Sequence, residues 1–251
     1  MRALYDLGWR LASFNFFEWL VQAKASGADT VVFDIRHMRT RKWSEEYTRR
    51  RFASICEPGP ALAGMRCEML ESNERVPDPV NGAGGAPLVA FWRKHGSVPR
   101  LKTVKPAGSE RYTVTLRNTQ RAPQRNSDEP VWRAFAEEIG ARVIPDYDRE
   151  PMHLHDRMAL YAGAEMNFFC SNGPAVLCTL TEYPCMLFNT NQAAGSLSAD
   201  GLPGWGAQYP WMLGNQRAIW EDASAESLRA HFYYWKRTGE FLERFGSPAE
   251  A

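Results

Sequence analysis

The chain has 251 residues, of which 44% are hydrophobic and 24% are charged, and its formal net charge is +1 at pH 7. This composition is that of a globular protein with enough length for one large domain or two small ones. Because the charges nearly cancel, the overall electrostatics do not favour binding to nucleic acid or to an anionic membrane surface, so any anion site has to be local.

Cysteine usage and the N-terminal segment indicate the compartment. Five cysteines without a C-x-x-C pair favour a reducing environment over a disulfide framework or a zinc site, so we expect a cytoplasmic protein. Polar residues interrupt the N-terminal stretch, and no segment approaches the roughly 20 apolar residues that span a bilayer. We therefore expect neither a signal peptide nor a transmembrane helix.

The first half of the chain predicts a small α/β unit. An amphipathic helix over 14–26 ends at Gly27, and a β-branched strand over 30–35 follows it. Ser44 is the expected cap of a second helix over 43–56. A further strand over 65–70, a Pro- and Gly-rich loop over 71–86, and a short helix or irregular segment over 88–95 complete this half.

The second half alternates strands and helices more regularly. Strands are expected over 112–116, 142–145, 166–170, 185–188 and 217–220, and helices over 127–139, 152–162, 175–183 and 224–245. This alternation predicts a parallel sheet that is covered on both faces. The loop over 189–215 is long for a connection and is a candidate binding loop.

The most informative segment is a strand, a turn and a helix over 165–184. The apolar run EMNFFC stops at Ser171-Asn172-Gly173-Pro174 and resumes with helical spacing. Free backbone N–H groups at a helix start favour an anion, and a phosphate of a nucleotide or nucleotide sugar is the expected one. The same residues also make an ordinary helix cap, so this segment alone leaves both interpretations open.

Polar residues follow each predicted strand of the second half. Ligands of open α/β sheets bind beyond the carboxyl ends of the strands, so we group these residues into one predicted site. Arg117, Asn118 and Arg121 follow the first strand, and arginine suits a diphosphate because its planar fork makes paired bonds while keeping its charge. Asn189 and Asn191 follow the strand over 185–188 and are expected to add binding contacts. A solvated basic loop is the alternative for the arginines.

Candidates for a base that deprotonates an acceptor hydroxyl are His155, Asp34 and Asp148. Asp146 and Asp148 form a D-x-D triplet that could hold Mg²⁺ or Mn²⁺ against a diphosphate. This motif is weak, because Asp is also a common turn residue, and we expect no metal site. His153 and His155 would face different sides of a helix and would not share one metal ion.

The arrangement of Arg117 after a strand, then strand, Ser-Asn-Gly-Pro turn, helix, Pro184 and strand resembles the carboxyl-terminal half of GT-B-type glycosyltransferases. These include fucosyltransferase-like and bacterial surface-polysaccharide enzymes, and the resemblance covers about residues 110–221. It implies an α/β fold of two Rossmann-like parallel-sheet halves with a reduced amino-terminal half. It also implies that Arg117, Ser171, Asn172 and Gly173 contact the donor diphosphate. Many such enzymes carry a ribose-binding glutamate where this chain has Leu177.

The domain organisation expected from this resemblance has three parts. A smaller α/β acceptor-side domain covers 1–108, a Rossmann-like donor-binding domain covers 109–221, and a C-terminal helix over 222–251 packs back on the body.

The expected function is transfer of a sugar from a nucleotide-diphosphate donor to a hydroxyl of a carbohydrate or glycolipid acceptor, in synthesis of surface polysaccharide or glycoconjugate. Arg117 and Arg121 would stabilise the departing diphosphate without a cofactor or a divalent metal. Two alternatives remain open. One is a non-catalytic nucleotide- or sugar-phosphate-binding module of the same fold, and the other is a metal-dependent transferase centred on Asp146 and Asp148.

Overall fold

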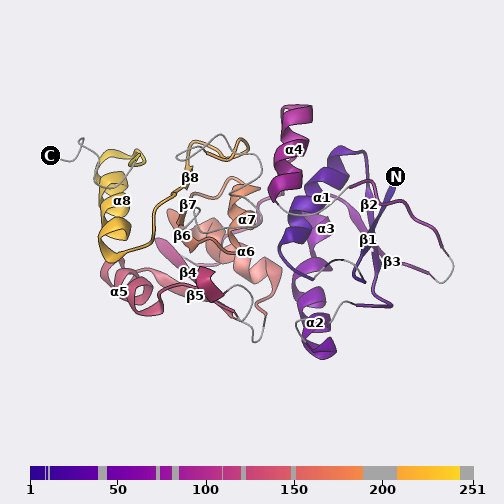
Figure 1. Cartoon of the computed structure of the whole chain (residues 1–251), viewed down its shortest axis with the longest axis horizontal. Coiled ribbons are helices and arrows are strands. Elements are labelled where there is room, and N and C mark those ends of the chain that lie inside the picture. Colours follow the sequence, from indigo (N-terminus) through magenta and orange to yellow (C-terminus); the bar gives the residue numbers. More distant parts are fainter. Residues whose placement is uncertain are drawn as a thin grey trace.

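The computed structural model describes residues 1–8, 10, 12–38, 44–71, 74–80, 85–108, 110–119, 123–147, 151–188 and 208–243. Within these ranges the chain forms two parallel β-sheets with helices packed against them, which is an α/β architecture (Figure 1). A three-stranded sheet belongs to the first half of the chain and a five-stranded sheet to the second half.

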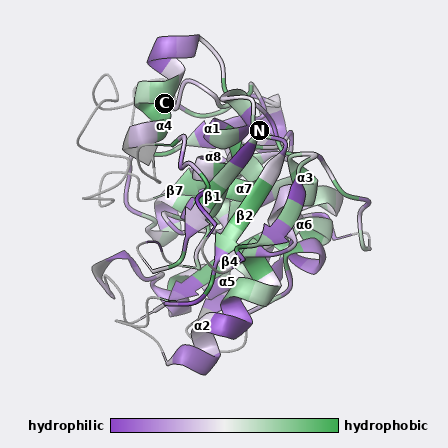
Figure 2. Cartoon of the chain, turned by 90° about the vertical axis from the view of Figure 1, so that its right-hand side faces the viewer, coloured by the Kyte–Doolittle hydropathy of each residue, from purple (hydrophilic) through white to green (hydrophobic). Residues whose placement is uncertain are grey.

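The first sheet has the order β1-β2-β3, with parallel pairing throughout. Its strands are β1 (Arg2–Asp6), β2 (Thr30–Asp34) and β3 (Arg66–Met69). The sequence predicted β2 and β3 but missed β1, because this five-residue strand begins and ends with a charged residue. Figure 2 shows the hydrophobic β2 running through the interior and the hydrophilic helix α2 at the periphery.

The helices of this half are α1 (Asn15–Ala25), α2 (Glu45–Arg51), a π-helical segment (Phe52–Cys56), α3 (Gly59–Leu62) and α4 (Gly85–His95). The predicted helix over 43–56 is confirmed as α2 with its π-helical continuation. Its cap is also confirmed, because Ser44 Oγ accepts a hydrogen bond from the Tyr47 N–H at 3.2 Å. α4 is a regular helix, where the sequence left helix or irregular structure open.

Helix α1 is buried along most of its circumference, including Glu18 and Gln22. On one side Phe16 and Trp19 pack on Tyr5 of β1, with ring centroids 4.8 and 4.9 Å apart. On the other side α1 packs against helices α4 and α7 (Figure 1). A helix that is apolar nearly all round lies inside a protein, so α1 is the layer between the two sheets.

The second sheet has the order β5-β4-β6-β7-β8, and all of its pairs are parallel. Its strands are β4 (Tyr112–Asn118), β5 (Arg142–Tyr147), β6 (Met166–Cys170), β7 (Cys185–Phe188) and β8 (Gln216–Ala218). All five predicted strands are confirmed, β6 and β7 with their predicted bounds. β4 and β5 extend two residues further than predicted, so Arg117 and Asn118 lie at the end of β4 and not in a loop.

Helices cover both faces of this sheet, as the alternating pattern predicted. α5 (Glu129–Ile139) and α8 (Ala225–Thr238) pack on one face, where Phe135 and Phe232 meet Phe168 of β6. α6 (Leu154–Gly163) and α7 (Ala175–Thr179) pack on the other face, where Tyr161 meets Phe169 at 5.2 Å. Successive residues of β6 therefore point to opposite helical layers.

Two helices end earlier than the sequence predicted. α7 stops at Thr179 and not at Tyr183, because the Thr181 hydroxyl donates to the carbonyl groups of Leu177 and Cys178 and turns the chain. α8 stops at Thr238 and not at 245, because Gly239 adopts a left-handed conformation with φ of 75°, which is typical of a helix end.

One hydrophobic core joins the two halves, and a connecting segment is hydrogen-bonded to both. The Leu101 N–H donates to Leu180 O at 2.8 Å, while the Lys102 N–H donates to Leu62 O at 2.7 Å. The Arg100 guanidinium donates to Thr179 O at 2.8 Å. These bonds hold α1 of the first half against α7 of the second half.

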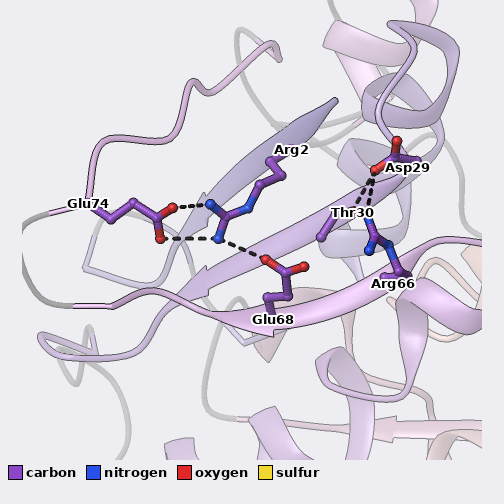
Figure 3. A network of polar contacts seen from close by, with 6 residues as sticks. All are labelled: Arg2, Asp29, Thr30, Arg66, Glu68 and Glu74. Carbon is purple, nitrogen blue, oxygen red and sulfur yellow. Dashed lines mark hydrogen bonds and ion pairs between the residues drawn. The ribbon is translucent and has the colours of Figure 1, made fainter.

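The amino ends of the three-stranded sheet carry a network of ion pairs (Figure 3). Arg2, the first residue of β1, pairs with Glu74 and with Glu68, the latter at 2.8 Å. Asp29, just before β2, accepts from the Thr30 hydroxyl at 2.6 Å and pairs with Arg66 at 3.5 Å. The charges at this end of the sheet are therefore engaged with one another.

Candidate functional site

The carboxyl ends of β4 and β6 lie side by side in the five-stranded sheet. The chain leaves β4 through α5 on one face and leaves β6 through α7 on the opposite face. This makes the β4–β6 boundary a topological switch point, which is where ligands of doubly wound sheets bind. Arg117 lies at the end of β4 and Ser171 directly follows β6, so the structure brings these two predicted site residues to that boundary.

The loop after β4 folds back on Arg117. Its guanidinium donates to Asn126 Oδ1, its N–H donates to Ser127 Oγ at 3.0 Å, and its carbonyl accepts from the Ser127 N–H at 2.9 Å. Ser127 Oγ also lies 3.2 Å from Cys170 Sγ at the end of β6. Arg117 is only 7% exposed, so its position is fixed. A positive charge held this far out of water is strengthened as a partner for an anion.

Arg125 supplies a second guanidinium at the same boundary. It ends the short 3₁₀ turn Pro123–Arg125, and its Nη2 donates to Ser171 O at 2.7 Å and to Ser171 Oγ at 3.3 Å. This links the loop after β4 to the turn after β6. Arg125 was not among the predicted site residues. A signal was present in the sequence, because Arg117, Arg121 and Arg125 follow one another at a spacing of four residues. We call Arg117, Arg125 and Ser171 the strand-end site.

The turn after β6 satisfies its own backbone. The Ala175 N–H donates to Asn172 Oδ1 at 3.2 Å, and the Val176 and Leu177 N–H groups donate to Gly173 O and Pro174 O. The expectation that these N–H groups are free at a helix start is therefore wrong, and α7 has only five residues. The positive charge at the strand-end site comes from arginine side chains. Contact of Ser171, Asn172 and Gly173 with a diphosphate stays a prediction.

Arg157 of α6 is a third buried guanidinium, with 3% of its surface exposed. It donates to Tyr161 Oη and to Pro145 O, each at 3.2 Å, and it lies 5.7 Å from the ring centroid of Phe14. Burial acts to lower the pKa of Arg157, but Tyr161 and Asp146 together raise it above its usual value, so it stays charged. The burial of Arg157 could not be predicted from the sequence, because an arginine in an amphipathic helix is usually on the surface.

The first half of the chain reaches the strand-end site through α1. A Cβ atom added to Gly173 would lie 3.0 Å from Phe14 Cδ2, so Phe14 packs directly on the turn. Glu18 lies four residues later, on the same face of the helix. It is 7% exposed, and no hydrogen bond or ion pair reaches its carboxyl group from the described residues. Burial raises the pKa of Glu18 to about 8.

Both Glu18 and Arg125 affect the pKa of Tyr209. Burial raises the pKa of Tyr209, Glu18 raises it further and Arg125 lowers it, so both charged groups act on one phenol. Tyr209 stacks on Trp211 with ring centroids 5.4 Å apart. Within the part of the chain that is described, neither the Tyr209 hydroxyl nor the Trp211 indole N–H has a hydrogen-bond partner. We call Phe14, Glu18, Tyr209 and Trp211 the junction cluster.

Two of the candidate bases chosen from the sequence, Asp34 and His155, lie within the described residues. The Asp34 carboxylate accepts two bonds from Arg36, at 2.7 and 3.0 Å, and these hold its pKa below the usual value. His155 is exposed and stacks on His153 at 5.6 Å. Among the described residues, no contact joins Asp34 or His155 to the strand-end site. Asn118 is exposed at the end of β4. The remaining predicted residues, Arg121, Asp148, Asn189 and Asn191, lie outside the described ranges.

Several further features bear on chemistry and compartment. All five cysteines are free. Among the described residues, no group of three or more His, Cys, Asp or Glu side chains is placed to hold a metal ion. A search of the same residues finds no helix with the length and apolar character needed to cross a membrane. Comparisons of the chain with protein-family models, with curated proteins and with solved structures find no match.

Proposed function

We propose that this protein is a glycosyltransferase that moves a sugar from a nucleotide-diphosphate donor to a hydroxyl of a carbohydrate or glycolipid acceptor. The observation that carries the proposal is the position of two arginines at the topological switch point: Arg117 lies at the end of β4, and Arg125 donates to Ser171 directly after β6. Arginine forks match the paired oxygens of a diphosphate, and they keep their charge when buried.

The two-sheet architecture supports a division of labour. The five-stranded half presents the arginines, and the three-stranded half covers the neighbouring turn with Phe14 from α1. We propose that the donor binds to the five-stranded half and that the acceptor approaches from the three-stranded half, in a GT-B-like arrangement. The product would be surface polysaccharide or glycoconjugate. Since five free cysteines suit a reducing compartment, we place the reaction in the cytoplasm.

The proposed chemistry needs positive charge where the diphosphate departs. Breaking the bond between the sugar and the diphosphate increases negative charge on the leaving group, and preorganised arginines stabilise that charge. Arg117 and Arg125 would act without a cofactor and without a divalent metal. Arg157, which is buried close to Phe14, adds to the positive potential that the donor meets.

The test is replacement of Arg117 and Arg125 by Ala, with Arg111→Ala as the matched control. Arg111 is an exposed arginine that lies just before β4, at the opposite end of this strand from Arg117, and it pairs with Glu165. We expect turnover of nucleotide sugars to fall at least about 100-fold in each site variant and to be unchanged in the control. Calorimetry should likewise show weaker binding of UDP and GDP by the two site variants, and unchanged binding by the control.

Unchanged turnover in Arg117→Ala would refute the proposal. Tight binding of UDP or GDP by the wild-type protein, with no turnover of any nucleotide sugar, would instead identify a non-catalytic binding module.

A further inference from the structure

We propose that Glu18 is the catalytic base that takes the proton from the acceptor hydroxyl. This inference rests on the proposed function and adds to it a residue on the acceptor side, where neither His155 nor Asp34 is joined to the strand-end site by the described contacts.

The carboxyl group of Glu18 makes no described interaction that would stabilise the fold. Its neighbours along α1 include Phe16, Phe17 and Trp19, which are fully buried. A carboxyl group in such a place destabilises the fold unless it is paired or neutral, and no described residue pairs with it. A buried titratable group without a structural partner is typical of a functional site.

Two observations relate Glu18 to the strand-end site. Along α1, it lies one helical turn after Phe14, and Phe14 contacts Gly173 of the turn after β6. Across the junction, Glu18 raises the pKa of Tyr209 and Arg125 lowers it, and Arg125 donates to Ser171. A sugar bound between the two halves would therefore have the arginines on its diphosphate side and Glu18 on its acceptor side.

The proton and electron balance of the step follows from these positions. The acceptor O–H bond breaks and its proton moves to a Glu18 carboxylate oxygen, while the acceptor oxygen forms a bond to the anomeric carbon. The bond between that carbon and the diphosphate oxygen breaks, and its electron pair stays on the diphosphate beside Arg117 and Arg125. Glu18 returns the proton to water when the product leaves.

Burial alone accounts for the raised pKa of Glu18. The titratable groups on the elements around it include Tyr5 and Asp6 of β1, Cys178 of α7, Tyr209, and the exposed last turn of α4 with Arg93, Lys94 and His95. A carboxylate with a pKa of about 8 is a stronger base than an ordinary carboxylate, and a base is most effective when its pKa lies near the working pH.

The kinetic experiment uses Glu18→Gln and the control Glu137→Gln, an exposed position on α5. Release of nucleoside diphosphate is measured with UDP- and GDP-linked sugars and methyl glycoside acceptors. We expect kcat of Glu18→Gln to fall about 10²- to 10⁴-fold with little change in UDP or GDP affinity. The wild-type kcat/KM should rise with pH to a plateau above about 8, and this inflection should be absent from the variant. Wild-type turnover in Glu18→Gln, or a retained inflection, would overturn the inference.

A second measurement does not depend on turnover. Carbon-13 NMR of glutamate-labelled protein should show one carboxyl signal that titrates near 8 and is missing from Glu18→Gln. Adding UDP or GDP should move this titration to higher pH, since a nearby anion disfavours the carboxylate. Nucleotide binding without such a shift, or a titration near 4.5, would overturn the role of Glu18 alone. If neither UDP nor GDP binds the wild-type protein, the proposed function falls and this inference falls with it.

Discussion

Replacing Glu18 with Gln also changes how the stability of the protein depends on pH. The folded-state pKa of Glu18 is raised to about 8, whereas the ordinary value that applies in the unfolded chain is 4.5. Between these two pH values the folded protein binds more protons at this residue than the unfolded chain does. The stabilising effect of protonation is therefore fully present below about 4.5 and is lost progressively as the pH rises through 8.

The size of the effect follows from the separation of the two pKa values. Moving from about 8 to 4.5 corresponds, at about 1.4 kcal/mol per pH unit, to about 5 kcal/mol of unfolding free energy over the whole range. About 3 kcal/mol of this falls between pH 6 and pH 9. Glutamine has nearly the same shape and does not ionise, so the variant lacks this loss of stability.

Urea unfolding of both proteins at pH 6, 7, 8 and 9 measures the difference. The stability of Glu18→Gln relative to wild type should rise by about 3 kcal/mol from pH 6 to pH 9. Glu137→Gln, on the exposed face of α5, should show a difference from wild type that stays constant over this range. A constant difference for Glu18→Gln as well would show that the carboxyl group is solvated, and it would refute the reasoning behind the further inference.

Two more predictions concern the strand-end site and its neighbours. Gly173→Ala should cost about 1–3 kcal/mol of unfolding free energy, because the new methyl group meets Phe14 at 3.0 Å, and the cost should largely vanish in a Phe14→Ala background. A double-mutant cycle by urea unfolding checks this, and an equal cost in both backgrounds would place Phe14 away from the turn. Excess EDTA should leave sugar transfer unchanged, since Arg117 and Arg125 supply the charge, whereas activity that is lost with EDTA and restored by Mg²⁺ or Mn²⁺ would favour a centre at Asp146 and Asp148.

Much of the second half could be predicted because its strands are short apolar runs with clear ends. β6 and β7 match their predicted bounds, since Ser171 and Pro184 mark where the chain must turn. The extension of β4 through Arg117 and Asn118 could not be predicted, because it depends on pairing with β5. The same holds for α7, which a side-chain hydrogen bond from Thr181 shortens.

The candidate site was predictable in part for a similar reason. Arg117 and Ser171 follow from the rule that ligands bind at the carboxyl ends of strands. The role of Arg125 depends on how the loop after β4 folds back, and a loop conformation is not encoded in hydrophobic periodicity. Glu18 was the hardest to find. A glutamate on an amphipathic helix is expected to face water, and only the packing of α1 between two halves shows that this one does not.

The topology and the charge distribution support the same location for function. At the amino ends of the three-stranded sheet, Arg2 and Arg66 are paired with acidic partners at the surface (Figure 3). At the carboxyl ends of β4 and β6, Arg117 and Arg125 lie at a boundary where the helices diverge to opposite faces. Because α1 closes this boundary from the other half, a ligand bound there meets both halves at once. Cations on one side and a buried carboxyl group on the other are what displacement of a diphosphate by a hydroxyl requires.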